Sequence, residues 1–241
     1  MVETIESRAP AEASFYDRVA ATYDRMMAAD GTRAIRQRFL RLVRSQAEPP
    51  GPILDFGCGT GIDARWYACA GYRVLAYDPS AGMMARLRRR CAGAIRSGRV
   101  VPVTGDVAAC LDAARGMAPF GCIASNFSAF NHVEHPEPLL RDLAGLLAPG
   151  GRIVLSLMNP WYWRDLRGGW WWRARLASLR HRGRFVVGEE NRTVRHEPLR
   201  VGRRAGLRRV SLQGARFGGA WGRLPGLPAD FLVFLVLERK R

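Results

Sequence analysis

The sequence predicts an α/β fold in which helices cover both faces of a mostly parallel sheet. From residue 52 onward, short apolar runs rich in Val, Ile and Leu alternate with segments of helical periodicity, as in right-handed crossover units. The last apolar run, residues 229–240, follows a predicted helix and strand and favours an antiparallel pair at the sheet edge. At 241 residues, the chain is long enough for one large domain, or one domain with an insertion.

The expected elements can be placed in chain order. Residues 15–27 and 32–45 repeat apolar side chains at helical spacing and predict an N-terminal helical cap over residues 1–48. A core over residues 49–160 is expected to hold five strands, at 52–57, 72–78, 99–106, 120–127 and 152–160. Its helices are expected at 63–71, 80–93 and 136–151, the last closed by a glycine pair. Residues 161–196 form a Trp/Arg-rich insertion, and residues 197–241 return to the sheet with a helix, a stop at Gly206 and two strands.

Composition limits the classes of protein. The chain has no window of 18 apolar residues and begins with an acidic, polar segment, so we expect neither a membrane span nor a signal, and a cytoplasmic location. Its five cysteines are scattered without a C-x-x-C pair, which favours free thiols over a zinc site. The net charge is +17, but 37 of the 38 basic residues are arginine, a bias that a GC-rich genome also produces. Residues 1–160 carry 19 basic and 15 acidic side chains and residues 161–241 carry 19 and 6, so the excess belongs to the last third.

The segment ILDFGCGTGID, residues 53–63, contains the pattern D-x-G-x-G-x-G at Asp55, Gly57, Gly59 and Gly61. Glycines between a strand and a helix bring a ligand against bare backbone at a helix N-terminus. A nucleoside triphosphate loop needs a lysine, and the only lysine here is at position 240. A dinucleotide loop needs a small third residue, and that position holds isoleucine.

With the motifs that follow it, this segment resembles the class I S-adenosylmethionine-dependent methyltransferases, of the small-molecule type related to the quinone-ring methyltransferases. The resemblance covers residues 15–160 well and 197–238 loosely. It implies a Rossmann-like seven-stranded sheet, with S-adenosylmethionine as cofactor. In this family an acid after the second strand holds the ribose hydroxyls, which implies that role for Asp78, 21 residues after Gly57. The same comparison places Asp106 and Val107 near the adenine and Asn126 near the methionine end.

Other residues complete the expected cofactor site. The ammonium and sulfonium groups are cationic, which favours Asp55 nearby. Helical spacing turns Tyr16 and Tyr23 the same way, and the family's N-terminal helix closes over the cofactor, although packing on the core explains both tyrosines equally well. Asp78 could instead cap the next helix, and Met83 could belong to the core. The cofactor set is Tyr23, Asp55, Gly57, Cys58, Gly59, Gly61, Asp78, Pro79, Met83, Asp106, Val107 and Asn126.

Methyl transfer is an in-line displacement that depends mainly on alignment and on the exclusion of water. If the acceptor is a hydroxyl or an activated carbon, a general base helps, and His132 after the fourth strand is the first candidate, with His196 the second. A loop histidine without a chemical role is the alternative for His132. His132 and His135 form H-x-x-H without a third ligand at sensible spacing, so no metal site is expected.

The acceptor is expected to meet Tyr16, Phe127, Trp161 and Trp163. The Trp/Arg-rich insertion could line an apolar or aromatic acceptor, hold the protein at an anionic membrane, bind nucleic acid, or simply pack on the body. The segment SNFS, residues 125–128, lacks the N-P-P-[YF] pattern of enzymes that methylate base amines. We therefore favour a small-molecule acceptor. An RNA methyltransferase and a non-catalytic S-adenosylmethionine-binding protein remain alternatives, and the oligomeric state stays open.

Overall fold

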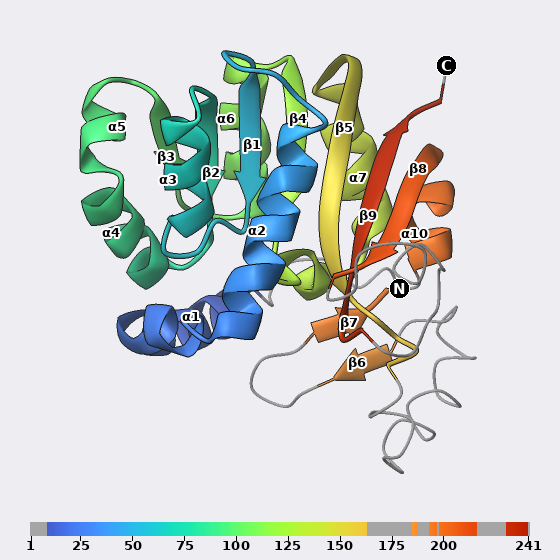
Figure 1. Ribbon diagram of the computed structural model, residues 1–241, viewed down its shortest axis with the longest axis horizontal. Helices are drawn as coiled ribbons and strands as arrows, with labels where there is room; N and C mark the ends of the chain where they lie inside the picture. Colours follow the sequence, from blue (N-terminus) through green and yellow to red (C-terminus); the bar gives the residue numbers. More distant parts are fainter. Residues whose placement is uncertain (1–8, 163–184, 188–192, 197, 216–229, 241) are drawn as a thin grey trace, which may run out of the picture.

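The computed structural model describes residues 9–162, 185–187, 193–196, 198–215 and 230–240, and Figure 1 shows a central sheet between two layers of helices. Seven strands form this sheet in the order β3-β2-β1-β4-β5-β9-β8. They are β1 (Pro52–Phe56), β2 (Arg73–Tyr77), β3 (Val100–Val103), β4 (Phe120–Ser125), β5 (Leu147–Met158), β8 (Leu207–Gly214) and β9 (Leu232–Arg239). A separate antiparallel pair joins β6 (Phe185–Val187) to β7 (Thr193–Arg195). The predicted fold class is confirmed.

The direction of the strands places the ligand site. Strands β1 to β5 pair in parallel. Strand β9 is antiparallel to β8, as predicted, and it is also antiparallel to β5. Strand β1 lies between β2 and β4, so the strand order reverses there. In doubly wound sheets, ligands bind beyond the carboxyl ends of the strands at such a reversal. The turns after β1 and β4 therefore bound the expected site.

The helices cover the sheet on both sides. They are α1 (Ala9–Met26), α2 (Asp30–Arg44), α3 (Ile62–Cys69), α4 (Ala81–Arg90), α5 (Ala92–Arg96), α6 (Val107–Met117), the 3-10 helix η1 (Ala129–His132), α7 (Pro136–Gly145) and α10 (Pro198–Arg204). No helix within the described ranges combines the length and apolar character that a bilayer crossing requires.

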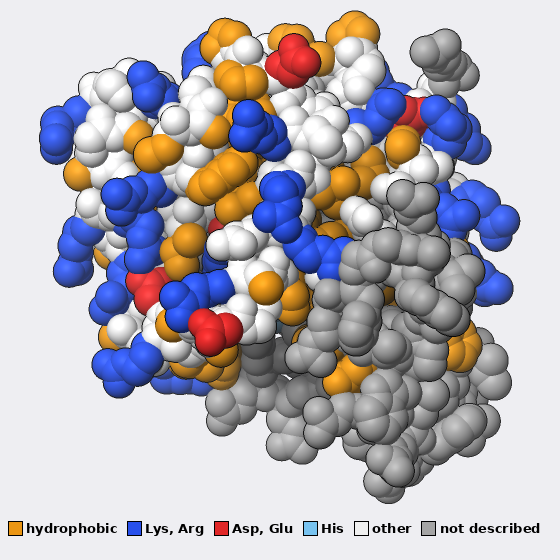
Figure 2. Space-filling model, viewed as in Figure 1, with side chains coloured by type: hydrophobic (Ala, Val, Ile, Leu, Met, Phe, Trp, Pro, Cys, Tyr) orange, Lys and Arg blue, Asp and Glu red, His pale blue; other side chains and the backbone are white. Residues whose placement is uncertain are grey.

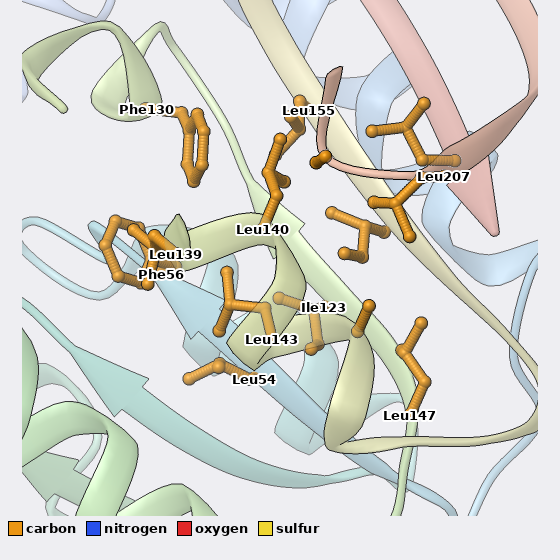
Figure 3. Close-up of a cluster of buried hydrophobic side chains, with 14 of the residues drawn as sticks. Leu54, Phe56, Ile123, Phe130, Leu139, Leu140, Leu143, Leu147, Leu155 and Leu207 are labelled. Carbon is orange, nitrogen blue, oxygen red and sulfur yellow. The ribbon is translucent and has the colours of Figure 1, made fainter. Parts of the chain in front are cut away.

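Successive residues of each central strand enter two different cores, as alternation in a strand requires. In β1, Ile53 belongs to a core that includes side chains of α2, α3 and α4, whereas Leu54 belongs to a second core that includes side chains of α6, α7 and α10. Figure 3 shows the second core, where Leu139, Leu140 and Leu143 of α7 lie against the sheet. Both faces of the parallel strands are thus buried, which explains their continuous apolar runs.

The structure corrects three expectations. Helix α6 was not predicted, and it follows β3 with Asp106 as its N-cap residue. The helix expected over residues 80–93 is two helices, because Cys91 leaves the helical conformation, with φ −101° and ψ 14°. The glycine pair does not close α7. It lies inside β5, and a Cβ on Gly151 would fall 2.8 Å from the carbonyl oxygen of Phe120, so only glycine fits there.

Helix α2 is held to the sheet by an aromatic contact. Phe39, fully buried, meets Phe234 of β9 edge to face, with ring centroids 5.3 Å apart. We expect Phe39→Ala to lower the free energy of unfolding by about 3–5 kcal/mol, because it leaves a cavity between α2 and β9. Urea denaturation measures this. Val210→Ala, at a position on β8 that is 42% exposed, should change it by less than about 0.5 kcal/mol, and equal losses in both variants would contradict this packing.

Candidate functional site

The glycine turn after β1 has a backbone that other residues rarely adopt. Gly57, Gly59 and Gly61 have φ values of 75°, 54° and 81°. A Cβ on Gly57 would fall 2.4 Å from the Cβ of Ala129 in η1, so the missing side chain lets the turns after β1 and β4 touch. Gly61 is the left-handed N-cap residue of α3. The spacing of the three glycines therefore follows from the path of the backbone.

A small cavity lies at this turn, bounded by residues of α1, α2, the β1–α3 turn and the residues after β4. Seven predicted site residues line it: Tyr23, Asp55, Gly57, Cys58, Gly59, Asn126 and Phe127. Four others join them: Arg36, Thr60, Ile62 and Asp63. The cavity measures about 30 Å³, close to the volume of one water molecule. Because Tyr23 of α1 forms part of its wall, we infer that α1 moves when a ligand of nucleoside size enters.

Buried carboxylates give this cavity its electrostatic character. Asp55 is 2% exposed, and its Oδ2 atom has no hydrogen-bond partner. Burial, and next the negative charge of Asp63, raise the pKa of Asp55 well above its ordinary value, while Arg36 opposes the shift. A cationic ligand group beside Asp55 would relieve both effects. Within the described ranges, no group of three or more His, Cys, Asp or Glu side chains is arranged to hold a metal ion.

A cluster around Asp63 completes the wall of the cavity. Arg36 of α2 forms an ion pair with Asp63, and Asn126 donates its amide N–H to the other Asp63 oxygen at 2.7 Å. The Arg36 guanidinium also lies over the ring of Phe127, 4.6 Å from its centroid. Phe127 and Ser128 both have positive φ, 45° and 57°, a strain that is typical of functional turns.

Sequence reasoning missed Arg36 and left Asp63 without a role. The ion pair joins residues 27 positions apart on different helices, so no local spacing reveals it. One signal was available for Asp63: it stands two residues after Gly61, directly beyond the glycine turn.

Asp78, after β2, ties the glycine turn to the start of α4. Its two oxygens accept backbone N–H bonds from Gly59 at 2.8 Å and Ser80 at 2.9 Å. Burial raises its pKa to about 6, although both backbone bonds favour the charged form. Ser80, not Asp78, is the residue that caps α4, so the helix-cap alternative for Asp78 is not what the structure contains. Each carboxylate oxygen keeps a second lone pair for a ligand hydroxyl.

Helix α1 is fixed over the site by a repeated Tyr-Asp pair, at residues 16–17 and 23–24. Asp17 accepts hydrogen bonds from the Ser80 hydroxyl at 2.5 Å and from the Gly82 amide at 2.7 Å, at the start of α4. Two turns later, Asp24 accepts from the Thr60 hydroxyl at 2.6 Å and pairs with Arg90. We call these two contacts the α1 clamps.

The two tyrosines of this repeat point toward different parts of the site. Tyr23 lines the cavity, and burial is the main cause that raises its pKa. The Tyr16 hydroxyl lies 3.0 Å from Nε2 of His132, with the two rings edge to face. One helix thus contacts both the cavity and the predicted base.

The other predicted residues lie around these groups or away from them. Asp106 caps α6 by accepting from the Ala109 amide at 2.8 Å, while Val107 is 37% exposed. Met83 is buried at the start of α4, and Pro79 before it is exposed. None of these four residues, nor Gly61, lines the small cavity, and their cofactor roles stay predictions.

His196 and the two tryptophans have different outcomes. His196 is 1% exposed and donates from Nε2 to the Val133 carbonyl at 2.8 Å, as a packed core residue does, so His132 stays the first candidate for a base. Trp161 is half-buried after β5, and its backbone N–H binds the Asn159 side chain. Trp163, like most of the 161–196 insertion, lies outside the described residues.

The fold and the site together define the class of this protein. The sequence resembles class I S-adenosylmethionine-dependent methyltransferases through its D-x-G-x-G-x-G turn and the acid after β2. The structure adds a cavity where the strand order reverses, between β1 and β4. The structure brings them together at one edge of the sheet.

Comparison with known proteins agrees with this class. The Methyltransferase domain family matches residues 27–190, and the chain belongs to that family. It is 33% identical over 150 residues to a ubiquinone biosynthesis O-methyltransferase of Xanthomonas axonopodis pv. citri, a match covering 59% of this chain and 60% of that protein. It is also 33% identical over 153 residues to a demethylmenaquinone methyltransferase of Clavibacter sepedonicus, covering 62% and 59%. The chain thus spans about three fifths of the length of these relatives.

Among solved structures, the DhpI–SAH complex superposes with a TM-score of 0.63 over 99% of this chain and 100% of that one. At 16% identity this likeness shows a shared fold. The family match confirms the predicted class and, with it, the cofactor S-adenosylmethionine.

The pKa of Asp78 leads to a pH prediction. If the ionised carboxylate accepts ligand hydroxyls, its protonation near pH 6 removes that acceptor, so affinity falls as the pH falls. We expect the Kd for S-adenosylhomocysteine to rise about ten-fold from pH 7 to pH 5, measured by isothermal titration. The Asp78→Asn protein should bind S-adenosylhomocysteine more weakly, and its Kd should not show this rise between pH 7 and pH 5. Any pH dependence that Asp55 causes is common to both proteins, so identical pH profiles would contradict the role of Asp78.

The α1 clamps lead to a second prediction. Asp24→Asn removes the ion pair with Arg90, an interaction of about 1 kcal/mol for a half-exposed pair. We expect amide hydrogen exchange in residues 15–26 to become about five-fold faster, because α1 opens more often. Asp30→Asn, which alters an exposed ion pair with Arg33 in α2, is the matched control. Equal exchange in the two variants would mean that Asp24 does not hold α1.

Proposed function

We propose that this protein transfers the methyl group of S-adenosylmethionine to a hydroxyl, or to an activated carbon, of a small apolar or aromatic metabolite. The observation that carries this proposal is the contact between Tyr16 and His132, because the Tyr16 ring also meets Tyr23, which lines the cavity. The two quinone-pathway relatives support an acceptor of the same chemical kind.

The cavity residues fit the cofactor on two observations. The Asp55 carboxylate is buried with one oxygen unpartnered, which suits the ligand ammonium, and the bare backbone of Gly57 and Gly59 allows close approach. In this proposal Asp78 accepts from the ribose hydroxyls. Arg36, the one guanidinium among the lining residues, pairs with the ligand carboxylate. Asp63 and Phe127 hold that guanidinium in place.

The chemistry asks little of the protein beyond alignment. S-adenosylmethionine supplies a methyl group that its sulfonium has already activated, so an in-line displacement follows once the acceptor oxygen or carbon is aligned. His132 takes the proton from the acceptor oxygen or carbon as that atom attacks the methyl group, because an imidazole accepts protons near neutral pH. Tyr16 positions the His132 ring through the 3.0 Å contact. Closure of α1 excludes water from the reacting atoms.

The described aromatic residues favour a flat, apolar acceptor. Phe127 lines the cavity, Tyr16 contacts His132, and Trp161 follows β5; in this proposal all three face the acceptor. Beside it, Tyr162 packs edge to face on Phe231, with ring centroids 5.5 Å apart. Such side chains bind an aromatic ring by contact area and by edge-to-face packing.

An assay with radiolabelled S-adenosylmethionine tests the proposal. We expect methyl transfer to small catechol, phenol or hydroxyquinone acceptors and none to total RNA. His132→Gln should lower kcat by about 10²–10⁴-fold while leaving the Kd for S-adenosylhomocysteine unchanged, because the base acts after binding. His135→Gln, three residues along in the same loop, is the matched control.

Two outcomes would contradict the proposal. Transfer to RNA alone would favour an RNA methyltransferase. Binding of S-adenosylhomocysteine without turnover across the small-molecule panel and RNA would favour a non-catalytic binding protein. A full kcat in His132→Gln would remove that residue from the chemistry.

A further inference from the structure

A second cavity lies away from the glycine turn, among α3, α4 and α5. Its volume is about 420 Å³, within the range of small-molecule sites. It shares no lining residue with the small cavity described above. Its lining residues are Arg65, Ala68, Cys69, Arg90, Cys91, Gly93, Ala94, Ser97 and Arg99.

The lining of this cavity carries one sign of charge. Three of the nine residues are arginines, and none is acidic. The same holds for the surrounding segment: residues 64–105 contain eight arginines, and their one acid, Asp78, is buried. Figure 2 shows basic side chains gathered on the side of the molecule that α4 and α5 form. The charge excess is therefore concentrated here as well as in the last third of the chain.

Helix ends do not account for this arrangement. Cations are favoured in the last turn of a helix, which explains Arg90 at the end of α4. The last turn of α3 contains no basic residue, so Arg65 lies outside the favourable position, and Arg99 lies beyond α5. Among the residues that the structure describes, no carboxylate lies within ion-pair distance of Arg65 or Arg99.

Two of the three arginines lie near one lining residue, Cys91. Cys91 is 2% exposed and lines the cavity. The charges of Arg90 and Arg65 both act to lower the pKa of the Cys91 thiol, against the larger effect of burial, so both guanidinium groups lie within electrostatic reach of one point. Arg90 has Asp24 as a counter-charge, whereas Arg65 and Arg99 have no carboxylate in ion-pair distance among the described residues. Three like charges around one cavity repel one another, and a bound anion removes that repulsion.

The chemistry of the lining selects the kind of anion. Guanidinium groups form paired hydrogen bonds with carboxylate and with phosphate oxygens. Three of them at one cavity match the several negative charges of linked phosphates better than the single charge of one carboxylate. No aromatic side chain lines the cavity, so it lacks the surface on which single-stranded RNA stacks its bases. It also lacks the large apolar side chains that insert into a membrane. A compact ligand with linked phosphate groups remains.

We propose that the cavity among α3, α4 and α5 binds a small anion with two or more linked phosphate groups, held by Arg65, Arg90 and Arg99. The proposal does not rest on the proposed methyl transfer. Binding has one consequence for the cofactor site, because Arg90 also donates to the Thr60 carbonyl and pairs with Asp24. A phosphate group competes with these partners for the same N–H donors, which weakens the α1 clamp at Asp24.

Isothermal titration with pyrophosphate and tripolyphosphate at 150 mM salt (roughly physiological ionic strength) tests the site. We expect binding by the wild-type protein, and at least about ten-fold weaker binding by the double variant Arg65→Gln/Arg99→Gln, equal to about 1.4 kcal/mol. The matched control, Arg88→Gln/Arg96→Gln, removes the same charge from two exposed positions on α4 and α5 outside the lining. It should change the Kd by less than about two-fold, because distant exposed charges are screened.

Three results would overturn the proposal. The first is no heat of binding by the wild-type protein at millimolar ligand. The second is an equal loss in both double variants, which would mean a diffuse basic surface. The third is tighter binding of an RNA of about 20 nucleotides than of tripolyphosphate, with equal losses of affinity in both double variants. That result would make the surface a nucleic-acid contact.

The link to the cofactor site has its own readout. Saturating tripolyphosphate should raise the Kd for S-adenosylhomocysteine about three- to ten-fold in the wild-type protein and leave it unchanged in Arg65→Gln/Arg99→Gln. Direct competition for the cofactor site would give the same rise in both proteins and would overturn the link. An unchanged Kd in the wild type would also overturn it.

Discussion

The close approach of two turns is the constraint on which the rest of the site depends. Gly57 after β1 lies so near Ala129 of η1 that any side chain on Gly57 would overlap it. This contact fixes η1 over the glycine turn and so sets the position of His132, the last residue of η1. Asn131 also holds η1 in place, because its side chain donates to the Val194 carbonyl and accepts from the Met158 backbone N–H. The missing side chain at Gly57 therefore joins the glycine turn after β1 to the segment after β4 that ends at His132.

Electrostatic balance gives the site its second property. Three carboxylates, Asp55, Asp63 and Asp78, are each at most 8% exposed, and Arg36 is the guanidinium that lies among them. Burying charges without full pairing costs free energy, which the protein recovers only when a ligand supplies the missing partners. The raised pKa values of Asp55 and Asp78 express that cost, since both groups hold protons more tightly than free carboxyls do. A ligand with a cationic end and hydroxyl donors suits this balance.

Much of this could be predicted from the sequence, and the part that could not has a common physical cause. The glycines and Asp78 were found because backbone geometry fixes their spacing along the chain, and the strands because burial on both faces makes them continuously apolar. Helix α6 was missed because small side chains weaken its periodic signal: only Cys110 and Ala114 of its residues are buried. The ion pairs of Asp63 and Asp24 join residues 27 and 66 positions apart, and only tertiary packing brings these together.

Helix α1 shows how a short repeat acquires meaning only in three dimensions. The Tyr-Asp pairs at residues 16–17 and 23–24 are two helical turns apart, so both tyrosines face one way and both aspartates another. The aspartates hold the helix to α4 and to the glycine turn, at two points about ten ångströms apart along its axis. With the helix fixed at both points, Tyr23 covers the cavity while Tyr16 reaches His132. Under the proposed function, closure over the cofactor and alignment of His132 are therefore one movement of α1, so the imidazole is in place only when water is excluded.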